Sequence, residues 1–352
     1  MEEKNKNSES VKDYAEENTA KSIADTEVPL DKNIRLMSPT RMVVRRFFRS
    51  KLSVIGLVLI IALFLFSWIG PLFWNVSETD RTMKIDYDRH PIEYVDENGE
   101  SHFFYQIVET GKELSSLAPP SAAHPLGTDM SGRDNLTRLM TGGRVSLSIS
   151  FLAVFIIMLL GVIFGGLAGY FGGVIDNIIM RACDILMCLP GIPVMLIVNT
   201  VLEGLKIDSE FRIYYLMGFL TLISWSGTAR LVRGQILSLR EQEYVLSAKA
   251  SGAKSSWIIR KHLIPNCISV IIISTALQIP SAIFTESYLS FLGLGVNAPM
   301  PSLGSLASDA LNGINSYPYR LVIPAIVISL IVLSLNLLGD GLRDAFDPKL
   351  NG

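Results

Sequence analysis

Long apolar runs constrain this sequence more than any other feature. Hydrophobic residues make up 49% of the chain, and charged residues are concentrated in the stretches between the runs. A helix of about 20 apolar residues crosses the ~30 Å hydrocarbon core of a bilayer. Spans are expected at about 52–74, 145–170, 174–201, 214–231, 267–289 and 321–338. Because backbone polar groups in lipid must be satisfied within the chain, these runs predict an all-α polytopic membrane protein of about six transmembrane helices.

Basic residues set the expected direction of the chain through the bilayer. The residues directly before the first apolar run include Arg41, Arg45, Arg46, Arg49 and Lys51. Lys and Arg accumulate on the cytoplasmic side of membrane proteins. The N-terminus is therefore predicted to be cytoplasmic, and an even number of crossings returns the C-terminus to the same side.

The polar stretches divide the chain into consecutive parts. Residues 1–40 are polar and poor in aromatics, which predicts a disordered cytoplasmic tail. The remaining parts are the first span with its basic flank (41–74), an acidic extracytoplasmic segment (75–140), a core of five spans with a cytoplasmic loop at 234–265 (141–345), and the cytoplasmic C-terminus (346–352).

The extracytoplasmic segment contains one hairpin signal. Asn98-Gly99 lies between two β-prone stretches, 92–95 and 101–108. This dipeptide best tolerates the positive φ angles of a type I′ turn. We therefore predict a β-hairpin, which is either a docking surface for an external partner or a simple surface excursion.

The stretch 241–266 is a charged interruption, rich in small residues, between two apolar runs. Ser238 and Glu241 have the spacing of a capping box, which predicts the start of a short helix. Gly252 can end that helix, because glycine readily adopts the left-handed conformation of a C-cap.

A second short helix is expected after this glycine joint. Ser255 or Ser256 can cap it, and Pro265 marks entry into the next apolar run. The small side chains around Gly252 would let another protein approach the backbone closely, which suits a docking element. The alternative is an amphipathic loop on the lipid headgroups, with Arg260 and Lys261 at phosphates. Local sequence leaves both open.

Several residues inside the apolar runs carry further predictions. Gly161, Gly165 and Gly169 recur at four-residue spacing, which predicts a flat groove for a neighbouring helix. Arg181 and Asp184 can form an i,i+3 pair, which favours a structural role. Pro190 and Pro193 fall in the middle of the third expected span.

Glu286 is the candidate for a translocation pathway. An ionisable residue at membrane depth is a functional candidate by default. The alternative places Glu286 at the outer interface, which the neighbouring Ser287, Ser290 and Gly293 favour.

No motif for catalysis or for a cofactor stands out. The stretch 251–255 lacks the Gly-Lys pair of a phosphate-binding loop, so the chain is not expected to hydrolyse ATP. Neither a His-Glu-x-x-His helix nor a Gly-x-Ser-x-Gly elbow is present, and no catalytic residue or metal site is expected. Cys183, Cys188 and Cys267 are interpreted as reduced packing residues. A net charge of −2 without a basic domain argues against nucleic acid.

Four stretches resemble one known family. In the loop, Glu243-Tyr244-Val245, Ala248-Lys249-Ala250, Gly252-Ala253 and His262-Leu263-Ile264-Pro265-Asn266 resemble the EAA loop of bacterial ABC importer permeases. The other stretches are His124-Pro125-Leu126-Gly127-Thr128-Asp129 with Gly132-Arg133-Asp134, residues 289–296, and Gly339-Asp340-Gly341-Leu342-Arg343-Asp344 with Asp347-Pro348. From about Arg45 to Lys349 the chain resembles the C-type permease of the oligopeptide, dipeptide and nickel group.

The resemblance implies a fold, partners and coupling residues. It implies the type I ABC importer arrangement, a multi-pass location in the bacterial cytoplasmic membrane with lipid contact, and a peptide substrate. The implied partners are a B-type permease, two cytoplasmic ATPase subunits and an extracytoplasmic solute-binding protein. The implied ATPase-coupling residues are Glu243, Tyr244, Ala248, Lys249, Gly252, Ala253 and Pro265.

One position departs from the family pattern, and other functions stay open. Leu246 and Ser247 stand where the family has Glu-Ala, so Glu243 is the residue that can supply the acidic contact. The same machinery could import nickel or glutathione, although the long outer segment favours oligopeptides. A stand-alone secondary transporter is disfavoured by the nearly charge-free span interiors. A receptor or scaffold is a further alternative. Copurification of the chain with nucleotide-binding subunits would exclude it.

Overall fold

The computed structural model describes residues 39–74, 83–95, 101–114, 116–207, 209–295 and 300–346. Most of the predicted tail and the predicted Asn98-Gly99 turn lie outside these residues. The chain divides into two units, Met1–Val44 and Arg45–Gly352. The described part of the first unit is the beginning of helix α2 (Pro39–Arg49).

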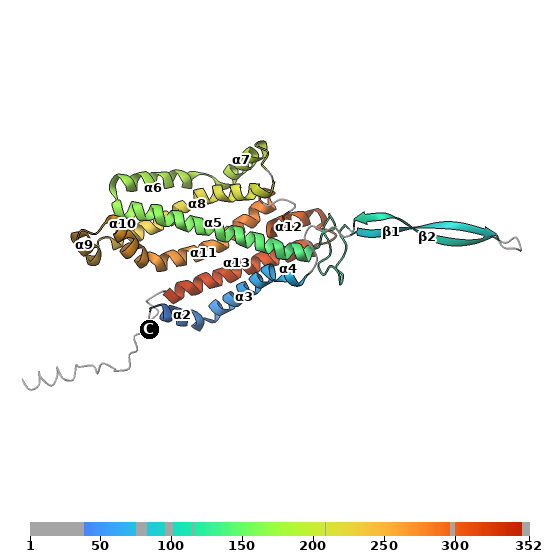
Figure 1. Cartoon of the computed structure of the whole chain (residues 1–352), viewed down its shortest axis with the longest axis horizontal. Helices are drawn as coiled ribbons and strands as arrows, with labels where there is room; N and C mark the ends of the chain where they lie inside the picture. The colour runs from blue at the N-terminus through green and yellow to red at the C-terminus, as the bar shows by residue number, and fades with distance from the viewer. Residues whose placement is uncertain are drawn as a thin grey trace, which may run out of the picture. The chain divides into compact units, whose positions relative to one another are not determined.

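Helices make up most of the described part of the second unit (Figure 1). In chain order the elements are α3 (Lys51–Trp68), α4 (Gly70–Phe73), β1 (Met83–Val95), β2 (Ser101–Leu114), α5 (Asn135–Phe171), α6 (Gly173–Cys188), α7 (Gly191–Gly204), α8 (Ser209–Leu239), α9 (Glu243–Ala250), α10 (Ser255–Ile258), the π-helix η1 (Ile259–Leu263), α11 (Ile264–Phe291), α12 (Leu303–Ala310), the 3₁₀-helix η2 (Leu311–Gly313) and α13 (Tyr319–Phe346).

Helix α5 is the common neighbour of the long helices. It packs against α8 and α11, and it also contacts α3 and α6. Helix α13 packs between α3 and α11, so α8, α5, α11, α13 and α3 lie in sequence across the unit (Figure 1). The predicted all-helical membrane architecture is therefore confirmed for the described helices.

The number of clear spans differs from the six predicted. Among the described residues, four helices are long and apolar enough to cross a membrane: Lys51–Trp68, Asn135–Phe171, Ser255–Phe291 and Tyr319–Phe346. A bent pair of helices, α6 with α7, raises the number to five if the pair is one span. Helix α8 is long, but Ser, Thr and Gly residues and Arg230 lower its mean hydropathy.

The third predicted span is broken rather than continuous. Helices α6 and α7 meet at an angle of 85°. Pro190 is the N-cap of α7, and Pro193 lies in the first turn of that helix. A proline fits the first turn, where its missing N–H would have no partner, but it interrupts a helix that approaches from the N-terminal side.

The two strands pair in the region of the predicted hairpin. Strands β1 and β2 are antiparallel, with a register that runs from Val95 opposite Ser101 to Met83 opposite Leu114. The register shifts once, between Asp86 and Tyr87. Both strands are longer than the stretches predicted from sequence.

The glycine groove on α5 receives α8, as predicted. A Cβ atom on Gly161 would lie 2.5 Å from Thr228, and one on Gly169 would lie 2.9 Å from Ile236. At Gly165 the new atom would lie 2.4 Å from the carbonyl oxygen of Ala229. Small residues at four-residue spacing therefore allow the two helix backbones to approach closely.

Ion pairs join α6 to α8. Arg181 and Asp184 approach to 3.5 Å, which confirms the predicted i,i+3 pair, and Arg230 of α8 also pairs with Asp184. About two turns nearer the start of α6, Arg233 Nη2 lies 2.5 Å from Asp176 Oδ2. These contacts hold α6 beside α8 although most apolar side chains of α6 are exposed.

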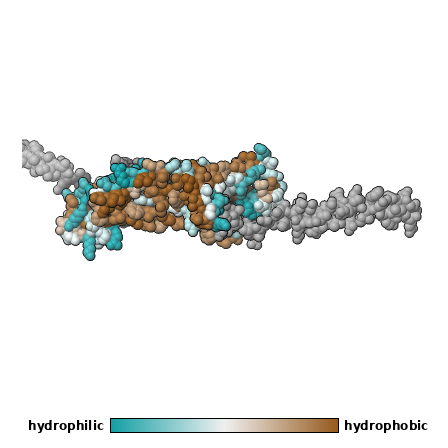
Figure 2. All heavy atoms as spheres, turned by 90° about the horizontal axis from the view of Figure 1, so that it is seen from above, coloured by the Kyte–Doolittle hydropathy of each residue, from teal (hydrophilic) through white to brown (hydrophobic). Residues whose placement is uncertain are grey.

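The exposed surface of the helical unit is apolar over much of its length. Figure 2 shows a brown hydrophobic belt with hydrophilic residues gathered towards both ends. Phe155 and Val174 are among its large exposed side chains, with exposed fractions of 55% and 74%. Such a continuous apolar surface fits contact with lipid or with another membrane subunit.

The glycine groove makes a direct prediction about stability. Gly165→Ala places a methyl group against a backbone carbonyl of α8, so we expect a loss of about 1–3 kcal/mol from overpacking. The melting temperature of the purified protein in detergent measures this effect. Gly218→Ala is the matched control, because a Cβ atom at Gly218 of α8 meets nothing within 4 Å. Equal melting temperatures for the two variants would contradict the packing model.

Candidate functional site

The first arm of the 241–266 loop is helix α9. It begins at Glu243 with Gln242 as its N-cap, and within the described residues this cap makes no side-chain hydrogen bond. The predicted capping box at Ser238 and Glu241 is wrong. Helix α8 continues to Leu239, so Ser238 is still inside a helix and cannot begin the next one.

Gly252 forms the joint, as predicted. Its φ angle is +78°, in the left-handed region that favours glycine. The N–H of Gly252 donates to the carbonyl of Lys249 at 3.0 Å, and the N–H of Ala253 donates to the carbonyl of Ala248 at 3.1 Å. These paired bonds are a Schellman motif, which satisfies carbonyls at the end of α9.

The second arm is not a separate helix. Residues Ser255–Phe291 form one continuous helical segment, with Lys254 as its N-cap. Ser255 and Ser256 therefore lie inside the helix, and the prediction that either caps it is wrong. Pro265 lies in the first turn of α11, directly after a π-helical turn.

The π-helical turn accommodates this proline. Proline lacks an N–H and its ring clashes with the carbonyl four residues earlier, here that of Lys261. The wider turn from Ile259 to Leu263 displaces this carbonyl, so the helix passes Pro265 without ending. The Asn266 side chain donates to the His262 carbonyl at 2.6 Å and satisfies one of the released acceptors.

Buried apolar contacts fix the loop to the long helices. Val245 of α9 is fully buried in a cluster with Val232 and Ile236 of α8, Leu263 of η1 and Cys267 of α11. The ammonium group of Lys249 lies 5.1 Å from the ring centroid of Tyr170 at the end of α5. The loop and the adjoining helix ends therefore form one packed body.

The predicted coupling residues fall on the outward face of this loop or directly beneath it. Glu243, Tyr244, Lys249, Gly252 and Pro265 are exposed, whereas Ala248 and Ala253 are half-buried against the cluster. Leu246, which replaces the acidic residue of the family pattern, has an exposed fraction of 51%. The exposed face therefore combines small, apolar and charged groups.

Glu286 is fully buried between three helices. Its carboxylate accepts hydrogen bonds from Ser290 at 2.8 Å and Ser287 at 3.3 Å. Ser146 of α5 and Ser302, the N-cap of α12, also hydrogen-bond to it. This shell gives Glu286 a packing role between α5, α11 and α12, and its place in a pathway stays a prediction.

A neutral hollow lies between α5, α8 and α11. It has a volume of about 220 Å³, and polar side chains line it beside Ala, Leu and Met residues. The polar residues are Thr221, Ser224, Gln278, Ser281 and Thr285. Sequence analysis missed this hollow, although Gln278, Ser281 and Thr285 recur at a helical i, i+3, i+7 spacing on an apolar span.

The motif that begins at His124 folds into a hydrogen-bonded loop before α5. Asp129 accepts backbone N–H bonds from Ser131 and Arg133, both at 2.8 Å, and it also binds the side chains of Arg133 and Arg138. Asp134 caps α5 by accepting from the N–H of Thr137 at 2.8 Å. The acidic residues of this motif thus order the entry into α5.

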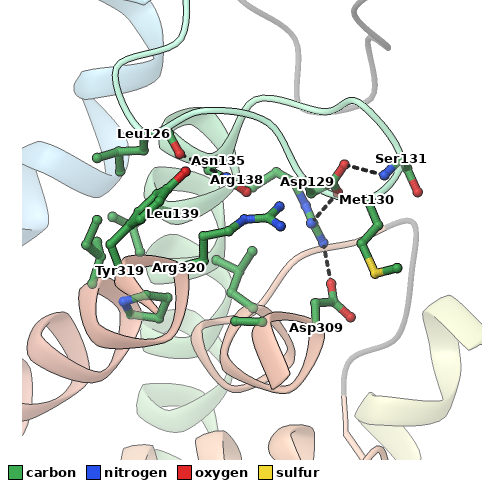
Figure 3. Close-up of a pocket in the computed structure, with 14 residues that line it drawn as sticks. Leu126, Asp129, Met130, Ser131, Asn135, Arg138, Leu139, Asp309, Tyr319 and Arg320 are labelled. Carbon is green, nitrogen blue, oxygen red and sulfur yellow. Dashed lines mark hydrogen bonds and ion pairs between the residues drawn. The ribbon is translucent and has the colours of Figure 1, made fainter. Parts of the chain in front are cut away.

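A second cavity lies beside this loop (Figure 3). It is lined by the loop, by the beginning of α5, by α12 and by the beginning of α13, and its volume is about 220 Å³. Arg138 and Arg320 both face it. Neither arginine was singled out from the sequence. Arg320 binds a backbone carbonyl far along the chain, and Arg138 bridges Asp129, nine residues before it, and the distant Asp309.

Comparisons with known proteins agree with these features. Residues 161–352 match the family described as "Binding-protein-dependent transport system inner membrane component". Residues 38–91 match the "N-terminal TM domain of oligopeptide transport permease C".

The chain is also similar to characterised relatives. It is 39% identical over 306 residues to the oligopeptide transport system permease protein OppC of Bacillus subtilis, covering 87% of this chain and 88% of the relative. It is 41% identical over 315 residues to the dipeptide transport system permease protein DppC of the same organism, covering 89% and 87%.

The chain is also 34% identical over 328 residues to the glutathione transport system permease protein GsiD of Pectobacterium atrosepticum. This match covers 93% of this chain and 96% of the relative. Among solved structures, the MetNI methionine ABC transporter matches with a TM-score of 0.49 and 18% identity, over 59% of this chain and 96% of that chain. The sequence matches establish that this chain belongs to the family of binding-protein-dependent transport system inner membrane components, the membrane-embedded, non-catalytic permease subunits of ABC transporters.

Proposed function

We propose that this chain is a permease subunit of an ATP-driven importer of oligopeptides or dipeptides. The observation that carries the proposal is the exposed α9 loop, which is locked to the ends of α5, α8 and α11 by Val245 and its cluster. Two relatives of 39% and 41% identity, named as oligopeptide and dipeptide permeases, support a peptide substrate.

The proposed topology has six spans, with both termini in the cytoplasm. Helix α8 is the sixth span beside the clear candidates, because its 31 residues extend over roughly 45 Å and it packs along α5. The α6–α7 pair crosses as one broken span. This topology places the α9 loop in the cytoplasm and the segment before α5 on the outer side, in agreement with the basic flank of α3.

In this proposal α9 transmits the motion of a cytoplasmic ATPase. The exposed face with Glu243, Tyr244 and Leu246 docks in a cleft of an ATPase subunit. Closure of two ATPase subunits around ATP moves the cleft, and the packed loop carries α8 and α11 with it as a rigid body. ATP drives the change because it binds the closed arrangement more tightly. A second permease subunit and a solute-binding protein complete the importer.

The neutral hollow is the proposed contact surface for the passing peptide. Hydroxyl and amide groups can hydrogen-bond to a peptide backbone, and these groups are common to every peptide. In this part of α5, α8 and α11 no charged residue lines the hollow, so it favours neither sign of peptide side chain. Such a surface suits substrates of varied sequence.

Substrate uptake tests the function as a whole. The complex of this chain with its partner permease, ATPase subunits and binding protein is reconstituted in proteoliposomes with ATP inside. We expect ATP-dependent uptake of labelled di- and oligopeptides, with weak competition from glutathione or a nickel chelate. Uptake of glutathione with no uptake of peptides would replace the proposed substrate, since a glutathione permease is also among the relatives.

Gly252 tests the coupling. Gly252→Val puts a β-branched residue at a φ of +78°, where such residues are strained, so the Schellman joint should distort. We expect normal membrane insertion and subunit assembly, continued ATP hydrolysis, and peptide uptake reduced by roughly tenfold or more per ATP. Gly252→Asn is the matched control, because Asn tolerates the left-handed region. Full uptake by the valine variant would refute a coupling role for this joint.

The hollow and Glu286 make contrasting predictions. Ser281→Ala with Thr285→Val removes two hydroxyl groups from the hollow, and we expect peptide uptake to fall by roughly threefold or more. Glu286→Gln keeps the size of this buried side chain, which lies outside the hollow, and its amide group can still hydrogen-bond to the surrounding serine hydroxyls, so uptake should persist. The opposite pattern in the same uptake assay would move the pathway to Glu286.

A further inference from the structure

The cavity beside the start of α5 has an apolar floor. Its floor consists of Leu139, Leu306 and Ile323, which also pack on the buried core cluster that includes Leu147 and Leu303. The cavity is therefore a dead end. Along α5, Arg138 and Ala153 of the neutral hollow are separated by roughly 20 Å, so the cavity is distinct from that hollow.

The acidic residues at the cavity are already engaged. Arg138 has an exposed side-chain fraction of only 2%, and it bridges Asp129 at 2.6 Å and Asp309 at 3.2 Å. Arg133 binds the same carboxylate oxygen of Asp129 at 2.7 Å. These carboxylates therefore leave little capacity to neutralise another cation.

Arg320 supplies positive charge that these pairs do not neutralise. Its Nη2 donates to the carbonyl oxygen of Thr128 at 2.6 Å, and in the described part of the chain it forms no ion pair with a carboxylate. Figure 3 shows its guanidinium group extending into the cavity between Tyr319 and Asp309. Arg133 and Arg138 share Asp129, and Arg138 also binds Asp309, so among the described residues neither aspartate of the cavity forms an ion pair with Arg320.

Further donors at the cavity lack partners. The Nε atom of Arg138 and the hydroxyl group of Tyr319 are both buried, and neither has a hydrogen-bond partner among the described atoms. Both residues line the cavity. Buried donors without partners are uncommon in folded proteins and call for an explanation at each site.

A carboxylate group would satisfy the hydrogen-bond donors at this cavity. An ionised carboxylate accepts hydrogen bonds and donates none, and it matches the planar guanidinium group in geometry. Apolar side chains that line the cavity can contact the short alkyl stem of a glutamate side chain. Asp309, half-exposed at the rim, repels a carboxylate from its own side and directs it towards Arg320.

We propose that this cavity receives an acidic side chain of the extracytoplasmic binding protein when that protein docks. The inference rests on the proposed function, which supplies the partner and places the segment before α5 on the outer side. A side chain projecting from a docked protein can enter and leave a dead-end cavity through its mouth. A passing substrate would need an exit that the apolar floor denies.

Docking affinity tests this assignment. The assembled transporter is placed in nanodiscs, and its affinity for the liganded binding protein is measured with wild type, Arg320→Gln and Arg320→Lys. We expect Arg320→Gln to weaken docking by about tenfold and to flatten its dependence on ionic strength, since one charge pair is lost. Arg320→Lys should recover part of the affinity. Basal ATP hydrolysis should be unchanged, and its stimulation by the binding protein should fall in parallel.

Two further variants keep the result interpretable. Tyr319→Phe removes only the hydroxyl group without a partner, so it should leave the fold intact and weaken docking by roughly threefold. Lys206→Gln removes an exposed cation from the loop after α7, outside the cavity, and should leave the affinity unchanged. Equal docking by wild type, Arg320→Gln and Tyr319→Phe would overturn the proposal.

The experiment also separates the possible failures. If free peptides with a C-terminal carboxylate, but not C-terminally amidated ones, bind the transporter in an Arg320-dependent manner while docking is unaffected, the cavity belongs to the substrate and the proposal is overturned. If the binding protein fails to stimulate even the wild-type complex, the importer function itself fails. If the binding protein stimulates the wild-type complex and Arg320→Gln has no effect, only the proposed docking site is refuted.

Discussion

The close approach of α5 and α8 is the contact on which the rest of the structure depends. Gly161, Gly165 and Gly169 leave no side chains between the two backbones, and Ala229 and Thr228 of α8 fill the groove. Between apolar helices in lipid the hydrophobic effect supplies little driving force, so association depends on such packing. This contact positions both ends of α8, one of which leads directly into α9.

The loop after α8 gains its rigidity from burial rather than from capping side chains. Within the described residues neither Gln242 nor Lys254 forms a side-chain cap, whereas Val245 and Ile258 are fully buried in the same cluster. The Schellman motif at Gly252 then sets the angle between α9 and the continuous helix that passes Pro265. A loop held in this way can pass a displacement to α8 and α11 without bending.

Sequence patterns predicted the features that depend on one segment alone. The apolar runs, the glycine groove, the Gly252 joint and the Arg181–Asp184 pair all follow from local spacing, and the structure shows each of them. The capping errors have two causes. Helix α8 runs to Leu239, past Ser238, whereas the helix after Gly252 begins at Ser255 itself, so Lys254 and not a serine is its N-cap.

What the sequence by itself determined is the membrane class, the family and the position of the exposed loop, because hydropathy and short motifs are properties of consecutive residues. Tertiary structure alone decided the bend between α6 and α7, the burial of Glu286 among serines of three helices, and the neutral hollow. It also decided the placement of Arg320 at the second cavity, where Arg138 already holds both aspartates. Each of these features depends on contacts between side chains from distant segments, and a pattern of consecutive residues carries little information about such contacts.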